Sequence, residues 1–260
     1  MGQAYTVVQP QDKTPEGGPM PNPSAAMLVI GDEILSGRTR DANMYFLAGE
    51  LTKSGIDLKE VRVVSDDAPA IIAAVKALSE AYDTVFTSGG IGPTHDDITA
   101  DCVAEAFGRH IDVRDDARKL LEDAYGKRGI EVTEARLRMA RIPDGAALID
   151  NPVSTAPGFT VENVHVMAGV PAVFEAMVAS VLPTLTGGTP LTSQTLRIMR
   201  GEGDIAGPLR DLAGTYPDLS FGSYPFQSNG VFGANVVVRG SDPALVAEAM
   251  TKLSEVFPDA

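Results

Sequence analysis

The chain has 260 residues, a length that fits one large domain or two small ones. Of these residues, 44% are hydrophobic and 22% charged, a composition typical of globular proteins. Asp and Glu outnumber Lys and Arg by 35 to 21, and a nucleic-acid backbone needs basic surface, so we exclude nucleic acid as a partner. The sequence has a single cysteine, and we find no apolar run long enough for a membrane span and no secretory signal pattern. We therefore predict a cytoplasmic protein that does not bind membranes.

Residues 1–24 are rich in Pro, Gly and polar residues and predict a disordered tail. From residue 25 onward, short apolar runs alternate with loops and amphipathic stretches. Strands are predicted at 26–30, 61–64, 84–87 and 164–167, each followed by a loop and a helix, with further helices at 115–128 and 134–141. This rhythm predicts an α/β domain over residues 25–187, in which a mostly parallel central sheet lies between two layers of helices.

A different order follows the Gly- and Pro-rich linker at 186–190. Strands are predicted at 191–199, 219–224 and 234–239, and helices at 204–212 and 243–256. The β-α-β-β-α order predicts that residues 190–260 form a small α+β subdomain and do not extend the main sheet.

A glycine-rich segment with the sequence Gly-Gly-Ile-Gly-Pro-Thr-His occupies residues 89–95, between a predicted strand and a predicted helix. Glycine lets the backbone turn tightly and approach a ligand closely. The N-terminus of the next helix presents unpaired N–H groups and the positive end of its dipole. The segment therefore predicts a phosphate site, whose candidate residues are Gly89, Gly90, Gly92, Pro93, Thr94 and His95.

Acidic residues follow two of the predicted strands: Asp66 after 61–64, and Asp96 and Asp97 before the helix at 98–107. They either cap helices or serve the ligand, by binding a divalent metal or by orienting water. Because loops at the carboxyl ends of parallel strands converge, we expect Asp66 and Asp97 to flank one ligand. Asp66 and Asp97 are the candidate catalytic residues. Asp96 and Asp97 are the candidate ligands of Mg²⁺, Mn²⁺ or Co²⁺, and K⁺ is a further candidate cation.

Two more loops are predicted to reach the same edge. Gly31, Asp32 and Glu33 follow the first strand and either face the ligand or are solvated. Gly169 and Pro171 begin the helix after the strand at 164–167.

Other polar residues are given structural roles. Asp41 and Asn43 are expected to cap a helix, and His165 is expected to be structural. No two histidines stand at zinc-ligand spacing, and Cys102 falls within a predicted helix, where packing is expected rather than nucleophilic chemistry.

Two long motifs carry a resemblance to a known family. They run from Ile30 to Asn43 (Ile-Gly-Asp-Glu-Ile-Leu-x-Gly-x-Thr-x-Asp-x-Asn) and from Gly89 to Thr99. Both resemble the molybdopterin-binding domain of CinA-type proteins, and more closely the N-terminal domain of eukaryotic FAD synthase. Residues 155–159 are similar to a third family segment, and residues 221–225 are similar to the small domain that follows in those relatives.

The resemblance implies the fold of the molybdopterin adenylyltransferases MogA and MoaB, with Asp66 and Asp97 aligned to the two aspartates of the pterin-nucleotide site. It also implies metal-dependent hydrolysis of a pyrophosphate such as ADP-ribose or FAD, and assembly as a dimer or trimer. The chain departs from the family pattern at Ala168, where proline is usual, and at Ser154, where glycine is usual. Gly169 and Pro171 of the first pattern are retained, so the resemblance implies an anion site at the start of that helix. A family Asn–Arg pair is missing near residue 136, which leaves Arg138 and Arg141 as basic candidates.

Three functions remain open. The leading hypothesis is a metal-dependent nucleotide pyrophosphatase. The second is molybdopterin binding or adenylyl transfer in cofactor assembly, and the third is a non-catalytic nucleotide-binding protein. All three require a small-molecule nucleotide or pterin at the same site.

Overall fold

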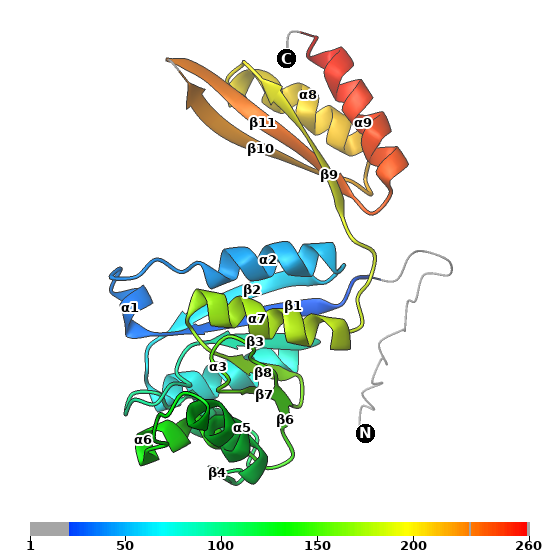
Figure 1. Cartoon of the computed structure of the whole chain (residues 1–260). Helices are drawn as coiled ribbons and strands as arrows, with labels where there is room; N and C mark the ends of the chain where they lie inside the picture. The colour runs from blue at the N-terminus through cyan, green and yellow to red at the C-terminus, as the bar shows by residue number, and fades with distance from the viewer. Residues whose placement is uncertain (1–20, 229, 259–260) are drawn as a thin grey trace, which may run out of the picture.

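The structure is a computed structural model that describes residues 21–228 and 230–258. Figure 1 shows a main lobe and a smaller lobe joined by a short connection. The elements of the main lobe are β1 (Ser24–Ile30), α1 (Asp32–Leu35), α2 (Asn43–Lys53), β2 (Asp57–Val64), α3 (Ala68–Ala81), β3 (Thr84–Ser88), α4 (Thr99–Ala106), β4 (Ile111–Val113), α5 (Asp115–Gly126), α6 (Glu134–Leu137), η1 (Arg138–Ala140), β5 (Arg141–Pro143), β6 (Ala147–Ile149), β7 (Gly158–Val161), β8 (Val164–Met167), α7 (Pro171–Val181) and η2 (Leu182–Thr184). Those of the small lobe are β9 (Thr192–Ile198), α8 (Glu202–Thr215), β10 (Ser220–Ser228), β11 (Val231–Gly240) and α9 (Pro243–Val256).

The main sheet has the strand order β2-β1-β3-β8-β7-β6. β1 pairs in parallel with β2 and β3, and β3 pairs in parallel with β8, whereas β7 is antiparallel to both of its neighbours. The predicted mostly parallel sheet is confirmed. Parallel strands point their carboxyl ends to one edge, so the loops that follow β2, β1, β3 and β8 emerge together.

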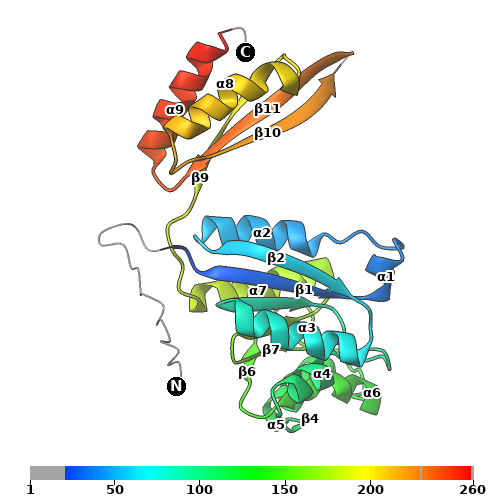
Figure 2. The same cartoon turned by 180° about the vertical axis from the view of Figure 1, so that it is seen from behind.

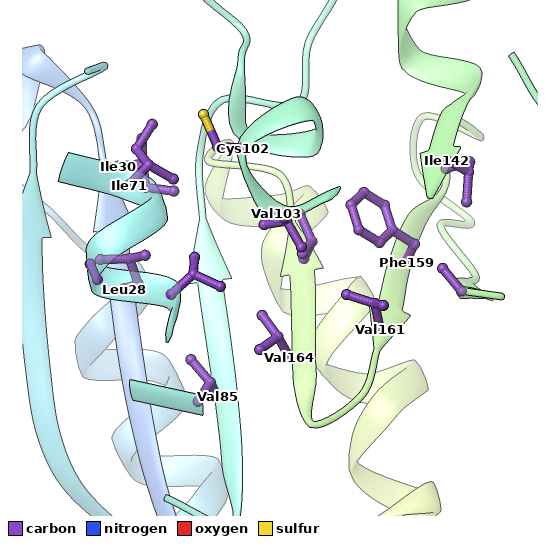
Figure 3. Packing of buried hydrophobic residues seen from close by; sticks show 14 of the residues in the cluster. Leu28, Ile30, Ile71, Val85, Cys102, Val103, Ile142, Phe159, Val161 and Val164 are labelled. Carbon is purple, nitrogen blue, oxygen red and sulfur yellow. The ribbon is translucent and has the colours of Figure 1, made fainter. Parts of the chain in front are cut away.

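Both faces of this sheet are buried, which explains why β1 is apolar along its whole length. Its even-numbered residues, such as Leu28, pack with α3, α4 and α5, as Figure 3 shows for Leu28, Ile71 and Val103. Its odd-numbered residues, such as Met27, pack with α2 and α7 on the opposite face. Because side chains alternate between the two faces of a strand, β1 contributes to two separate hydrophobic cores. Both predicted layers of helices are present.

Four short strands of the main lobe, β4 to β7, were not predicted. Each has three or four residues, too few for an alternating pattern to stand out. The helix predicted at 134–141 is also shorter. It ends as η1, and Arg141 begins β5, which pairs with β4.

Residues 22 and 24, which fall within the predicted tail, make defined contacts with the main lobe. Ser24 is already part of β1. The side-chain amide of Asn22 makes two hydrogen bonds to the backbone of Thr189: its Oδ1 accepts the N–H at 2.9 Å, and its Nδ2 donates to the carbonyl at 3.1 Å. Gly188 N–H adds a bond of 3.0 Å to the Gly55 carbonyl. The start of the linker is therefore fastened to the main lobe. The prediction of disorder for residues 1–20 lies outside the described residues.

The small lobe has the predicted β-α-β-β-α order, with strands arranged β10-β11-β9. α8 and α9 cover one face of this sheet, as Figures 1 and 2 show from opposite sides. Ile205, Val236 and Leu253 belong to its separate core. Within the described ranges, no helix of either lobe combines the length and the apolar character that a bilayer crossing requires.

His165 is buried in β8 between two threonines. Its ring nitrogens lie 2.9 Å from Thr160 Oγ1 and 2.9 Å from Thr84 Oγ1, and burial lowers its pKa from 6.5 to about 4. The folded protein therefore holds this imidazole neutral, as expected for a structural histidine.

We predict that His165 makes stability depend on pH. Between pH 4 and 6.5 the unfolded chain binds a proton at His165 that the folded chain does not. The free energy of unfolding should therefore rise with pH across this window, by about 3 kcal/mol in total. Urea unfolding at several pH values measures this slope, which H165Q should reduce and H95N, at a side chain that is 99% exposed, should leave intact. Equal slopes in H165Q and wild type would contradict the assignment.

Candidate functional site

A cavity of about 700 Å³ lies at the carboxyl ends of the main-sheet strands. This volume is within the usual range of small-molecule sites. The cavity is bordered by loops from several parts of the chain: Ile30, Glu33, Thr39, Asp66, Gly89, Gly90, Ile91, Gly92, Asp96, Asp97, Met139, Asn151, Ser154, Ala156, Ala168, Gly169, Val170, Pro171 and Val173.

The strand order arranges these residues along the edge of the sheet. Asp66 follows β2 at one end, the loops after β1, β3 and β8 come next, and the loop that enters β7 is at the other end. From β2 to β7 there are four strand-to-strand steps, about 19 Å at the usual spacing. The lining residues therefore follow one another along the sheet edge, and the glycine-rich loop lies near the middle of this row, which we call the trough.

Two glycines of that loop cannot be replaced without strain. Gly89 has φ +112°, and a β-carbon there would lie 2.2 Å from the Ile30 carbonyl oxygen. Gly90 has φ +69°, and a β-carbon there would lie 2.1 Å from Thr99 Oγ1. Positive φ and close backbone contact both demand glycine. The glycines therefore serve the tight turn first, and the turn brings the next peptide groups to the cavity.

The peptide N–H groups of Gly90, Ile91 and Gly92 make no hydrogen bond to any described residue. All three residues line the cavity. By contrast, Thr99 N–H at the start of α4 donates to the Gly90 carbonyl over 3.0 Å, and Ala100 and Asp101 border a separate void of about 10 Å³. The unpaired donors at this cavity therefore belong to the loop, since Thr99, Ala100 and Asp101 are not among the lining residues.

Asp97 shapes the end of the same loop. Its Oδ2 accepts hydrogen bonds from the N–H of Thr94 at 2.8 Å and from the Thr94 hydroxyl at 2.5 Å. Oδ1 of Asp97 accepts no hydrogen bond from the described residues, so one oxygen of this cavity-lining carboxylate is available.

Asp66 is held in a comparable way. Its Oδ2 accepts the N–H of Asp32 at 2.9 Å, which ties the loop after β2 to the start of α1. Glu33 curls over Gly31, where a β-carbon would meet its Oε2 at 2.6 Å. Asp66, Glu33 and Asp97 therefore reach one cavity from three successive strand ends, as the topology argument predicted for Asp66 and Asp97.

The lining is acidic. It includes four carboxylates, from Glu33, Asp66, Asp96 and Asp97, and the described lining residues include no lysine or arginine. No group of three or more His, Cys, Asp or Glu side chains in the described ranges is close enough to hold a metal by itself. The donor set fits Mg²⁺, which commonly uses one or two carboxylates and completes its octahedron with water and substrate phosphates.

The predicted site residues divide into two groups. Those at the cavity are Glu33, Asp66, Gly89, Gly90, Gly92, Asp96, Asp97, Gly169 and Pro171. Those outside its lining are Gly31, Asp32, Pro93, Thr94 and His95. Thr94 serves the site indirectly through Asp97, whereas the His95 side chain is 99% exposed and points into solvent.

Asn43 differs from its prediction as a cap. Asp41 Oδ1 accepts the N–H of Met44 at 2.9 Å, as a capping residue does, but Asn43 is only 3% exposed and turns inward. Its Nδ2 donates to Ser88 Oγ and to the Gly169 carbonyl, both at 2.8 Å. Asn43 therefore joins α2 to the ends of β3 and β8 just behind the cavity.

Sequence reasoning missed the loop before β7 as part of the site. Asn151, Ser154 and Ala156 line the cavity, and Met139 adds an apolar contact. The family-like segment at 155–159 was the available signal, but no residue in it has an obvious chemical role. Of the two basic candidates, Arg138 donates from Nη2 to the Asp97 carbonyl at 3.2 Å, and Arg141 pairs with Asp101. Both lie behind the loop and not at the cavity.

Comparison with known proteins gives consistent matches for both lobes. A family model described as probable molybdopterin binding domain matches residues 26–187, and one described as FAD synthase, middle domain, matches residues 190–260. A protein of Archaeoglobus fulgidus is 30% identical over 233 residues, which cover 90% of this chain and 97% of that protein. The probable FAD synthase of Caenorhabditis elegans is 32% identical over 90% of this chain, which spans 50% of that protein. Among solved structures, a CinA protein of unknown function from Thermoplasma acidophilum has a TM-score of 0.59 and 35% identity, over 64% of this chain and 99% of that one.

We predict that G90A is much more destabilising than G37A. The two glycines have nearly equal φ, +69° and +71°, but a β-carbon at Gly37 meets nothing within 4 Å. G37A should therefore lose about 1 kcal/mol for its backbone conformation alone, and G90A about 2 kcal/mol more for the contact with Thr99. Denaturant unfolding measures both. T99A should recover part of the loss in the G90A background, and equal losses for G90A and G37A would contradict the packing argument.

Proposed function

The chain belongs to the family described as probable molybdopterin binding domain, and on this premise we propose that it is a metal-dependent nucleotide pyrophosphatase acting on a dinucleotide such as ADP-ribose or FAD. One observation carries the proposal. Unpaired peptide N–H groups at Gly90, Ile91 and Gly92 line the same cavity as the carboxylates of Asp66 and Asp97. Donors for phosphate oxygens and acceptors for a cation or water are therefore side by side.

The reaction is attack of water on phosphorus. A bond forms between the water oxygen and one phosphorus of the diphosphate, and the bond from that phosphorus to the bridging oxygen breaks. Two phosphate monoesters result, AMP and ribose 5-phosphate from ADP-ribose, or AMP and FMN from FAD. The peptide N–H groups of the glycine-rich loop would hold the phosphate oxygens as charge develops on them. A carboxylate at the cavity would accept a proton from the attacking water.

Charge is the reason for a metal. An anionic diphosphate entering a cavity with four carboxylates and no basic lining residue meets repulsion that the peptide dipoles only partly offset. Asp97, with its available Oδ1, and Asp66 or Asp96 would hold a divalent cation. When bound, that cation supplies positive charge that neutralises the diphosphate and polarises its phosphorus.

The shape of the cavity supports a dinucleotide over a mononucleotide. A trough of about 19 Å along the sheet edge is long enough for a ring system on each side of a central diphosphate. The glycine-rich loop lies after β3, near the middle of the strands that border the trough. The match of the small lobe to the FAD synthase middle domain is a further reason to include FAD in the substrate class.

Molybdopterin binding or adenylyl transfer is the second candidate. The description of the matched family model favours it, because a pterin nucleotide also combines a ring with phosphate. It differs in requiring ATP and a pterin as reactants. A protein that binds these ligands without releasing AMP from any dinucleotide would support this candidate, and one that binds nucleotides without any turnover would support a non-catalytic role.

We also propose that the ligand is a small molecule and that the protein works in the cytoplasm as a dimer or trimer. The concave lining, with a volume of about 700 Å³, suits a small ligand. The formal charge of −14 disfavours contact with nucleic acid. Light scattering measures the assembly state directly.

We predict that D97N and D66N each lower AMP release from ADP-ribose or FAD by at least about 100-fold. Each replacement removes a negative oxygen from the cavity while keeping the size of the side chain. Removal of divalent metal by a chelator should stop turnover, and added Mg²⁺, Mn²⁺ or Co²⁺ should restore it.

D144N is the matched control, because Asp144 is exposed and its side chain makes no hydrogen bond to the described residues. It should keep wild-type activity. Melting temperatures should show that D97N and D66N remain folded at the assay temperature. Wild-type protein that releases no AMP from either dinucleotide with any of the three metals would overturn the proposed function.

A further inference from the structure

The loop at 151–157 forms the end of the trough that is farthest from Asp66. It leaves β6 and enters β7, so it emerges at the same edge of the sheet as the catalytic candidates. Its conformation is set by Asn151, which is 3% exposed. Asn151 Oδ1 accepts the N–H groups of Val153 and Ser154, both at 3.1 Å. Its Nδ2 donates to Ser154 Oγ at 2.6 Å and to the Ala156 carbonyl at 2.7 Å.

These four bonds use the full capacity of the Asn151 amide, which has two donors and two acceptor positions. Asn151 therefore has no group left for a ligand although it borders the cavity. Its role is to fix the loop and to orient Ser154, the next polar side chain on the cavity wall.

Ser154, unlike Asn151, keeps a hydrogen-bond donor that no described residue uses. Its oxygen accepts the bond from Asn151, and its hydroxyl proton is donated to no acceptor among the described residues. A hydroxyl carries one donor and two acceptor positions, so the O–H remains available at the cavity wall. Ala156 of the same loop is apolar, and so are Met139 and Val170 elsewhere in the cavity lining. An O–H donor in an apolar setting suits a ring that presents one acceptor atom.

Backbone strain at the next residue supports a functional conformation of this loop. Thr155 has φ +70°, a region that β-branched residues rarely adopt. Its N–H donates to the Asn151 carbonyl at 2.9 Å, which closes the turn around Ser154. Strain of this kind persists only where surrounding bonds enforce it, and it concentrates at ligand sites.

We propose that Ser154 is a specificity-determining residue, whose hydroxyl donates a hydrogen bond to a carbonyl oxygen or ring nitrogen in the heteroaromatic half of the ligand that lies away from Asp66. The inference rests on the proposed function for the class of ligand, a dinucleotide with two unlike halves. It adds the residue that reads one of those halves. Ser154 contacts neither the diphosphate nor the attacking water, so it acts in binding and not in the chemical step.

The test uses the two halves of FAD as separate probes. Calorimetric titration of the full chain with AMP and with FMN, in the presence of Mg²⁺, gives an affinity for each. S154A should weaken one of the two by about tenfold, the effect of one lost hydrogen bond, and leave the other unchanged. With FAD as substrate, KM should rise by a similar factor while kcat stays within about twofold.

Two further variants separate a lost donor from a disturbed loop. S154T retains the hydroxyl and should restore the affinity, and V153A removes an exposed side chain of the same loop that does not line the cavity and should change nothing. Loss of affinity for both halves in S154A would mean that the loop has collapsed and would overturn the assignment. So would unchanged affinity for both while wild-type protein still cleaves FAD. Wild-type protein that neither binds a half nor cleaves FAD would overturn the proposed function itself, and this inference with it.

Discussion

An anionic ligand and an acidic cavity repel each other, and the organisation of this sheet edge depends on how that conflict is resolved. Four carboxylates line the cavity, and no basic side chain does among the described residues. The attraction available within the chain comes from peptide N–H groups, which carry partial charge and are fixed in place by the backbone. In the proposed function, these dipoles would bind phosphate, and the carboxylates would bind a divalent cation. We therefore propose that ligand and metal bind as one unit.

The structure around the cavity holds those peptide groups in fixed positions. Buried strands end in loops that have little freedom: Gly89 contacts the Ile30 carbonyl, Gly90 contacts Thr99, and Asn43 joins the loops after β3 and β8 from behind. One carboxylate oxygen of Asp66 and one of Asp97 each accept a hydrogen bond from a backbone N–H of a loop. The same side chains therefore build the site and border it, so loss of a carboxylate affects both geometry and charge. Preorganised donors of this kind do not need to reorient when charge develops on a ligand.

The sequence was informative wherever a signal was long or chemically distinctive. The continuous apolar run at 26–30 identified β1, and short segments rich in β-branched and aromatic residues, each followed by a loop and a helix, identified β3 and β8. The parallel arrangement followed from this strand, loop and helix rhythm. Asp66 and Asp97 could be brought together because topology alone sends their loops to one edge. The short strands β4 to β7 gave no periodic signal, so the loop before β7 and its residues Asn151 and Ser154 remained unrecognised as part of the site. The side-chain directions of Asn43 and His95 depend on tertiary packing, which a linear pattern does not contain.

In the proposed function the peptide groups of Gly90, Ile91 and Gly92 bind the phosphate oxygens of the ligand, and amide resonances report on these groups directly. The measurement is a nitrogen–proton correlation spectrum of labelled protein titrated with a methylene-bridged, non-hydrolysable analogue of ADP-ribose, with and without Mg²⁺. The account predicts large shifts of these three amides when analogue and Mg²⁺ are both present, and little change with the analogue alone at the same concentration. The Gly37 amide, which is bonded to the Ile34 carbonyl and lies outside the cavity lining, should not respond. Saturable binding that leaves the resonances of Gly90, Ile91 and Gly92 unmoved would contradict the account.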